Sequence, residues 1–150
     1  MQVKEIMTRN VEKVEIDTPL TEVAQRMKTH DIGMLPVFDG DSLVGMITDR
    51  DITVRATANG LHPEKTRSRE VMTSSTVYCF EDQDIGEAGR IMQENKIRRL
   101  PVMNRQQRVV GIVSLGDIAL GTGDSNLVYA TTQKVSTPDA PKPLPGQKRE

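Results

Sequence analysis

The alternation of hydrophobic and polar positions predicts the same order of elements twice along the chain. In the first copy, the β-like apolar runs are residues 11–16, 32–38 and 43–47. In the second copy, they are residues 76–80, 97–103 and 108–113. The last two runs of each copy are separated by turn residues, Asp39-Gly40-Asp41 and a segment around Asn104-Arg105-Gln106, which predicts a hairpin. Each copy is therefore expected to contribute three strands.

Apolar residues at helical spacing predict an amphipathic helix after the first strand of each copy. They recur at i, i+3, i+4 and i+7: Leu20, Val23, Ala24 and Met27, then Ile85, Ala88, Gly89 and Met92. We expect Thr18 to cap the first helix, with Pro19 at its first position, and Asp82 or Asp84 to cap the second.

Each copy ends in a strand that runs into a second helix. The sequence GMITDRDI at 45–52 returns as GIVSLGDI at 111–118, and both contain a hydroxyl residue three positions before an aspartate. That spacing is a capping box, and the unpaired N–H groups of a helix start also suit an anion such as phosphate. The helices are expected from Thr48 to about Asn59, ended by Gly60, and from Ser114 to about Leu120, ended by Gly121.

Further landmarks recur in register. The opening segments, Glu5-Ile6-Met7-Thr8 and Glu70-Val71-Met72-Thr73, lie 65 residues apart (72 minus 7), as do the two Leu-Pro-Val triplets. The triplets place Pro36 and Pro101 inside predicted strands, which indicates a sheet edge or a gap that faces a ligand. A repeat held in register over such a length establishes an internal duplication.

The repeat predicts an α+β fold, an α/β-type sandwich of two tandem β-α-β-β-α units. The expected boundaries are residues 1–60 for the first unit, 61–69 for a polar connector and 70–122 for the second unit. Asp124 is expected to cap a helix over residues 123–135. Residues 136–150 are rich in Ser, Pro and Lys and are predicted to be disordered.

Composition excludes several classes of function. The net charge is −1, aromatic residues make up 3% of the chain and tryptophan is absent, so neither a nucleic-acid surface nor an anionic membrane is indicated. No apolar run reaches membrane-spanning length and no signal peptide is evident, which predicts a cytoplasmic protein. Cys79 is the single cysteine and is expected to be buried, while His30 and His62 lack companions for a metal site.

Catalysis is not indicated either. No P-loop, dinucleotide-binding glycine motif or nucleophile–base set is present, and Thr48, Asp49 and Asp51 do not form a matched acid–base pair. We therefore expect a protein that is not an enzyme.

The repeated Met-Thr, Leu-Pro-Val and Gly-x-x-(Thr/Ser)-x-x-Asp landmarks resemble a tandem pair of cystathionine β-synthase (CBS) domains over about residues 3–122. Residues 30–37 and 48–52 resemble small stand-alone bacterial CBS-pair proteins, including the hypoxic response type. The family implies packing by pseudo-twofold symmetry, two clefts for adenosyl ligands such as AMP, ADP, ATP or S-adenosylmethionine, and a homodimer.

The resemblance implies roles for particular residues. In the first cleft, Asp117 would hold the ribose, Ser114 would contact phosphate, Arg98 and Arg99 would neutralise it, and Thr8, Lys13, Ile32 and Gly33 would line the base. In the second cleft, Thr48 and Asp51 would do the same, with Arg50, Thr73, Tyr78 and Ile97 nearby. Gly33 and Met34 replace the arginine pair there, so the first cleft is the stronger candidate.

The sequence thus favours a regulatory sensor that acts on a separate, unidentified protein. Two alternatives remain open. The aspartates could serve only as helix caps in a ligand-free structural dimer, and salt-dependent retention of RNA or DNA would instead indicate a nucleic-acid binder.

Overall fold

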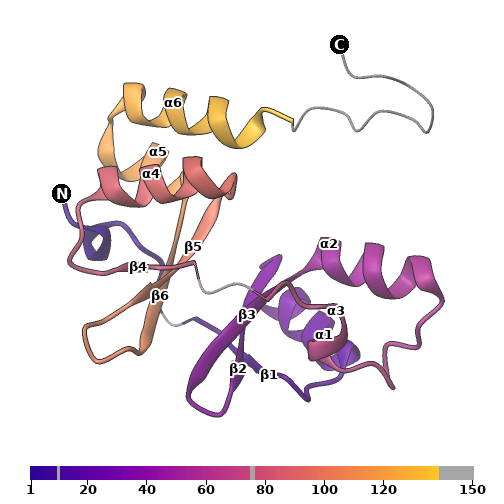
Figure 1. The fold of residues 1–150 in the computed structure, drawn as a ribbon. Helices are drawn as coiled ribbons and strands as arrows, with labels where there is room; N and C mark the ends of the chain where they lie inside the picture. The colour runs from indigo at the N-terminus through magenta and orange to yellow at the C-terminus, as the bar shows by residue number, and fades with distance from the viewer. Residues whose placement is uncertain (10, 75–76, 139–150) are drawn as a thin grey trace, which may run out of the picture.

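Two three-stranded sheets of identical strand order form the centre of the protein (Figure 1). The structure, a computed structural model, describes residues 1–9, 11–74 and 77–138. In both sheets the first strand runs parallel to the second, which pairs antiparallel with the third. The strands are β1 (Val14–Glu15), β2 (Met34–Asp39) and β3 (Ser42–Thr48), then β4 (Cys79–Phe80), β5 (Arg99–Met103) and β6 (Val109–Ser114). The predicted α+β fold is confirmed.

The amphipathic helices α1 (Leu20–His30) and α4 (Ile85–Asn95) follow the first strand of each sheet, as predicted. Asp84 caps α4 by accepting a hydrogen bond from the Gly86 N–H. The prediction for α1 was wrong by one residue, because Pro19 is the N-cap and the Thr18 hydroxyl accepts the Glu15 N–H instead. Ala24 is exposed, although its position predicts burial.

A third group of helices follows the hairpins. The segments α2 (Asp49–Asp51), η2 (Ile52–Ala56) and η3 (Thr57–Asn59) follow one another without a break and form one helical stretch that ends at Gly60, as expected. The prediction for α5 (Leu115–Thr122) was wrong at its end, because the left-handed C-cap is Gly123. Gly121 serves packing instead, since a Cβ there would stand 2.6 Å from the Ile6 side chain.

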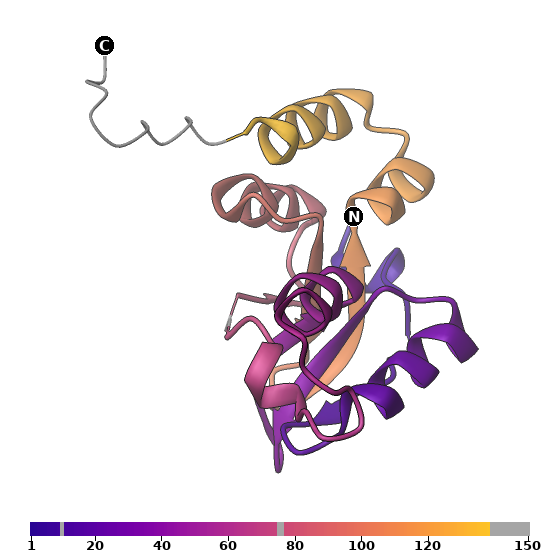
Figure 2. The same ribbon diagram turned by 90° about the vertical axis from the view of Figure 1, so that its right-hand side faces the viewer.

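The last described helix, α6 (Ser125–Ser136), packs across α4 in Figures 1 and 2. It begins after Asp124, which accepts the Leu127 N–H as the predicted cap. Leu127 covers Gly89 of α4, and the buried Thr131 hydroxyl accepts a hydrogen bond from Gln93 at 3.0 Å. The first repeat has no such covering helix among the described residues, which explains why Ala24, the counterpart of Gly89, is exposed. Disorder was predicted from residue 136 onward, which is wrong for Ser136 because this residue ends α6; residues 139–150 lie outside the described part of the chain.

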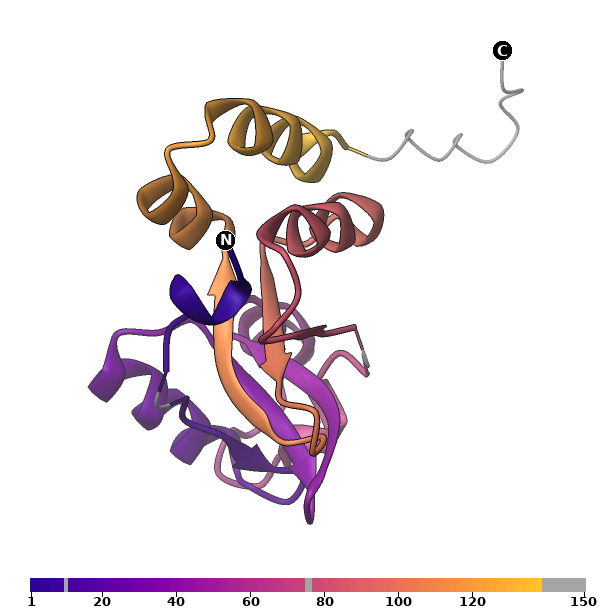
Figure 3. The same cartoon turned by 90° about the vertical axis from the view of Figure 1, so that its left-hand side faces the viewer.

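The opening segments are exchanged between the repeats, which the sequence did not predict. They form short helical turns, η1 (Val3–Glu5) and α3 (Ser68–Val71). Val3 and Met7 belong to the hydrophobic core beneath the second sheet, whereas Val71 belongs to the core beneath the first. Figure 3 shows the N-terminal segment beside β6. The predicted repeat boundaries remain a prediction. They assign each opening segment to one repeat, whereas its apolar side chains pack in the hydrophobic core of the other.

Main-chain pairing fixes this exchange at the sheet edges. Thr8 and Ile112 exchange two hydrogen bonds of 2.8 and 2.9 Å, and Thr73 and Met46 exchange two of 2.9 and 2.8 Å. Gly45 and Gly111 make the approach sterically feasible: a Cβ at these positions would stand 2.5 Å from the Thr73 carbonyl oxygen and 2.7 Å from that of Thr8. The pairing also covers β3 and β6, which are otherwise edge strands.

Pro36 and Pro101 lie in β2 and β5, the central strands, so the expectation of a sheet edge was wrong. In the first sheet, β1 begins opposite Val37, one residue beyond Pro36, so among the described residues no strand pairs with the proline on that side. The alternative expectation, a gap that faces a ligand, fits Pro36, which lines a groove between the two repeats.

We predict that Gly45→Ala and Gly111→Ala each lower the free energy of unfolding by about 1–3 kcal/mol, because the added methyl group forces the opening segment away from the sheet. The matched control is Gly116→Ala, whose Cβ would meet nothing closer than the Ser114 hydroxyl at 3.5 Å. That change should be neutral or slightly stabilising in a helix. Denaturant unfolding curves measure the difference, and equal midpoints for Gly45→Ala and Gly116→Ala would contradict the role given to the glycine.

Burial raises the pKa of the Cys79 thiol from 9.0 to about 12. We predict that a thiol-modifying disulfide reagent leaves the native protein unmodified at about pH 8 and reacts at once in denaturant, since only the thiolate attacks. Because the folded-state pKa is raised, the stability contributed by the neutral thiol is complete below the unfolded pKa and is lost as the pH rises from 9.0 toward 12. Rapid modification of the native protein would contradict the burial.

Candidate functional site

The helix starts after β3 and β6 share one geometry. The Ser114 hydroxyl accepts a hydrogen bond from the Asp117 N–H at 3.0 Å, and Asp117 Oδ2 accepts from the Ser114 N–H at 2.9 Å. Thr48 and Asp51 form the same two bonds, both of 3.0 Å. Both predicted capping boxes are therefore present, and each uses one oxygen of its aspartate. The second carboxylate oxygen distinguishes the two sites.

The Asp117 cleft is a cavity of about 350 Å³ between the two repeats. Residues from the first repeat form one wall, and residues from β5, β6 and α5 form the other. Its lining includes predicted site residues from both repeats, namely Thr8, Ile32, Gly33, Arg99, Ser114 and Asp117. Asp117 is half-buried, and its Oδ1 has no hydrogen-bond or ion-pair partner within the described part of the chain.

Two residues predicted for this cleft lie elsewhere. The Arg98 guanidinium donates a hydrogen bond to the Ser136 hydroxyl at 3.1 Å, which ties it to the end of α6. The Lys13 ammonium lies 4.9 Å from the centre of the Phe38 ring, in the neighbouring groove. The structure therefore does not bring either residue to the Asp117 cleft. Arg99, which is exposed and makes no described ion pair, is the cation that remains there.

Sequence reasoning missed part of the cleft wall. His30 and Glu12 both line the cavity, and their side chains approach to 2.9 Å between Nε2 and Oε1. The sequence indicated only that His30 lacks companions for a metal site, and its position two residues before the predicted Ile32–Gly33 wall is the one signal that could have pointed to it. Asp31, in a left-handed conformation as the C-cap of α1, turns the chain into that wall.

At the equivalent site of the first repeat, Asp51 is buried and its Oδ1 already has neighbours. The Thr73 hydroxyl lies 3.4 Å from this oxygen and the Arg55 Nε lies 3.8 Å from it. Arg55 also donates hydrogen bonds to the carbonyl oxygens of Val71 and Met72, at 3.2 and 3.0 Å. Arg55 thus clamps the second opening segment and partly neutralises the Asp51 carboxylate.

Arg55 was missed by sequence reasoning, although its i, i+4 spacing from Asp51 signals an ion pair. Its counterpart after the second capping box is Gly121, which offers no side chain. Arg50 was predicted to lie near this cleft, and its described polar contact is the hydrogen bond that its backbone N–H donates to the Asp49 carboxylate at 2.8 Å.

The remaining residues predicted for the second cleft are dispersed. Tyr78 stacks edge-on against Phe80, with ring centres 5.5 Å apart, and lines a separate cavity of about 260 Å³ near the hairpin tips. Ile97 packs against the core of the second repeat. Of the predicted set, Thr48, Asp51 and Thr73 are the residues brought together.

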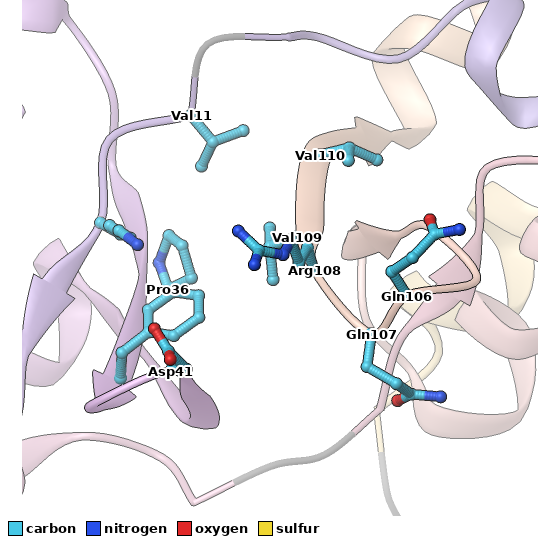
Figure 4. Close-up of a pocket in the computed structure, with 10 residues that line it drawn as sticks. Val11, Pro36, Asp41, Gln106, Gln107, Arg108, Val109 and Val110 are labelled. Carbon is cyan, nitrogen blue, oxygen red and sulfur yellow. The ribbon is translucent and has the colours of Figure 1, made fainter.

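A larger groove of about 590 Å³ continues from the Asp117 cleft along β2 and β6 toward the hairpin tips (Figure 4). Val11 lines both cavities. Figure 4 shows the Arg108 side chain directed into the space between the two repeats, across from Pro36 and Asp41.

The described residues contain no group of three or more His, Cys, Asp and Glu side chains placed to hold a metal ion. In the same part of the chain, no helix combines the length and apolar character that crossing a bilayer demands.

The sequence profile of the CBS domain matches this chain twice, at residues 3–56 and 69–120. The chain is 40% identical over 118 residues to the CBS domain-containing protein YhcV of Bacillus subtilis, which covers 79% of this chain and 83% of that protein. It is 41% identical over 117 residues to hypoxic response protein 1 of Mycobacterium tuberculosis, covering 77% and 81% of the two chains.

Solved structures share the fold. The crystal structure of hypoxic response protein I with two coordinated zinc ions is 38% identical, with a TM-score of 0.73 over 81% of this chain and 98% of that one. The CBS domain pair of MJ0100, in complex with 5′-methylthioadenosine and S-adenosylmethionine, is 30% identical, with a TM-score of 0.71 over 82% and 96%. CBSX2 in complex with AMP is 25% identical, with a TM-score of 0.66 over 79% and 93%.

Proposed function

Because this chain belongs to the CBS domain family and contains two such domains in tandem, we propose that it is a regulatory module that binds an adenosyl ligand in the Asp117 cleft. In this proposal the protein is a cytoplasmic homodimer, catalyses no reaction on its ligand and acts on a separate protein. AMP, ADP, ATP and S-adenosylmethionine are the candidate ligands, because solved relatives contain AMP, S-adenosylmethionine and 5′-methylthioadenosine.

The observation that carries the proposal is the free oxygen of Asp117. Oδ2 is held by the Ser114 N–H, which orients the carboxylate, while Oδ1 is left beside the cavity. A carboxylate oriented in this way can accept hydrogen bonds from the two hydroxyls of a ribose. At Asp51 the equivalent oxygen has Thr73 and Arg55 as neighbours, so the same motif has different uses in the two repeats.

The polar groups around Asp117 suit the rest of a nucleotide. The Ser114 hydroxyl accepts the Asp117 N–H, and its own hydrogen remains available for donation to a phosphate oxygen. Arg99 lines the same cavity and offers the planar fork that recognises phosphate, whereas Met34 occupies the equivalent position in the first repeat. Ile32 and Ile112 supply apolar surface for a base.

Regulation follows from the position of the cleft between the repeats. A ligand that contacts Ile32 and Gly33 on one wall and Ser114 and Asp117 on the other favours one relative arrangement of the two repeats. It shifts their equilibrium to the extent that it binds one arrangement more tightly than the other. The separate protein that is regulated would bind differently to the two arrangements of the repeats.

We predict that Asp117→Asn weakens binding of the adenosyl ligand by about 10–100-fold, the loss of about 1.5–3 kcal/mol expected for a hydrogen bond to a charged group. Asparagine keeps one oxygen for the Ser114 N–H, so the helix cap survives while the second acceptor becomes a donor. Thermal shift and calorimetric titration with AMP, ADP, ATP and S-adenosylmethionine measure the effect. Asp51→Asn is the matched control and should bind as wild type does.

Failure of every adenosyl ligand to raise the melting temperature of the wild type would overturn the proposal, because a ligand that binds only the folded state must stabilise it. In that case the ligand-free structural dimer becomes the better description. Recovery of a hydrolysed nucleotide would show that the protein is an enzyme.

We also predict that calorimetric titration gives one bound ligand per chain. The reason is that the Asp51 carboxylate lies beside Arg55 and the first repeat lacks an equivalent of Arg99. Two equivalents per chain in the wild type, with one lost in Asp51→Asn, would show instead that a ligand displaces Arg55.

A further inference from the structure

The groove beyond the Asp117 cleft has two walls that belong to different repeats. Residues of β2 line one wall, from the Asp117 cleft to the hairpin tips, and residues of β6 together with the residue before it line the other. They are Met34, Pro36 and Phe38 on the first wall and Ser114, Ile112, Val110, Val109 and Arg108 on the second. From Ser114 to Arg108, which directly precedes β6, the chain covers about 20 Å at about 3.3 Å per residue. The outer part of this groove is thus a compartment separate from the Asp117 cleft.

Two cations occupy opposite walls of the outer compartment. Lys13 comes from the first repeat and Arg108 from the second, and within the described residues neither forms an ion pair. Asp41 is the single carboxylate of the lining and is likewise unpaired there, so the lining carries a net charge of +1. Cations that face each other across a cleft with apolar walls concentrate a positive potential between them.

The duplication supplies an internal comparison. Lys13 corresponds to Tyr78 (78 minus 13 is 65), and Arg108 corresponds to Ser42 (108 minus 42 is 66). Tyr78 and Ser42 line the smaller cavity of about 260 Å³, which shares Asp41 and Gln107 with the groove. Both cations therefore line the compartment that adjoins the Asp117 cleft, and the smaller cavity has uncharged residues at both equivalent positions.

We propose that the compartment between Lys13 and Arg108 binds a phosphorylated small molecule through its phosphate groups. The ammonium and guanidinium groups supply only hydrogen-bond donors, as phosphate oxygens require. Val11, Pro36 and Phe38 form an apolar floor for the remainder of the molecule. The phosphates belong either to a second ligand or to the tail of a long ligand seated in the Asp117 cleft. In either case the bound anion joins the two repeats.

The test uses inorganic tripolyphosphate as the probe, titrated calorimetrically into the full-length protein. Lys13→Tyr and Arg108→Ser install the residues of the related cavity, and each should weaken binding by about tenfold or more, because a bridging anion loses one of two charge-assisted contacts. Affinity for the wild type should fall as salt is added. Asp41→Asn, which removes the opposing charge, should tighten binding.

Arg105→Ser is the matched control. Arg105 lies in the same turn as Arg108, yet its guanidinium is held by both carboxylate oxygens of Asp82, at 2.8 and 2.9 Å. Its loss removes the same charge from the chain without emptying the groove, so tripolyphosphate should bind this variant as it binds the wild type. Equal weakening by Arg105→Ser and Arg108→Ser would overturn the proposal, as would absence of binding to the wild type.

Asp117→Asn separates this site from the adenosyl site. Tripolyphosphate should bind Asp117→Asn normally, even if no adenosyl ligand binds the wild type. Displacement of tripolyphosphate by ATP but not by adenosine would assign the groove to the phosphate tail of one long ligand. Simultaneous binding of ATP and tripolyphosphate would assign it to a second ligand.

Discussion

The pairing of each opening segment with the sheet of the other repeat is the constraint on which the rest of the structure depends. At the sheet edges it is held by two main-chain hydrogen bonds at Thr8 and two at Thr73, and a side chain at Gly45 or Gly111 would clash with the paired segment. Through this pairing, Met7 completes one hydrophobic core and Val71 completes the other. The pairing also places Thr8 beside β6, where it becomes part of the Asp117 cleft. The same pairing therefore completes the two hydrophobic cores, covers the edge strands β3 and β6 and supplies part of the wall of the Asp117 cleft.

Duplication produced two equivalent sites that have since diverged through a few side chains. The helix caps remained the same, since each aspartate must hold the N–H of the hydroxyl residue that precedes its helix. The change occurred in the surroundings of the second oxygen. Arg55 lies beside it in one repeat, whereas Gly121 leaves it open in the other. The helix start is thus the structural part of the motif, and its neighbours decide whether a ligand can use it.

Much of this arrangement could be predicted from the sequence, because it depends on local spacing. The hairpins, the apolar faces of α1 and α4 and both capping boxes follow from patterns within a dozen residues. The errors arose where distant segments meet. Gly121 resembles a C-cap but lies against Ile6, and Ala24 lies at a predicted core position that none of the described helices covers. Arg98 and Lys13 were placed by the family resemblance, which does not reveal α6 or the Phe38 ring as their partners.

The exchange of the opening segments bears on how such a protein could arise. A chain with one repeat would have an uncovered strand at its sheet edge and a core without its methionine or valine, unless a second copy supplied them. A single-repeat protein with the same contacts would therefore be complete only as a pair of chains that exchange their opening segments. Joining two such repeats in one chain would convert a contact between molecules into a contact within one molecule. During synthesis on the ribosome, Thr8 likewise cannot pair with Ile112 until β6, the last strand of the second sheet, has emerged.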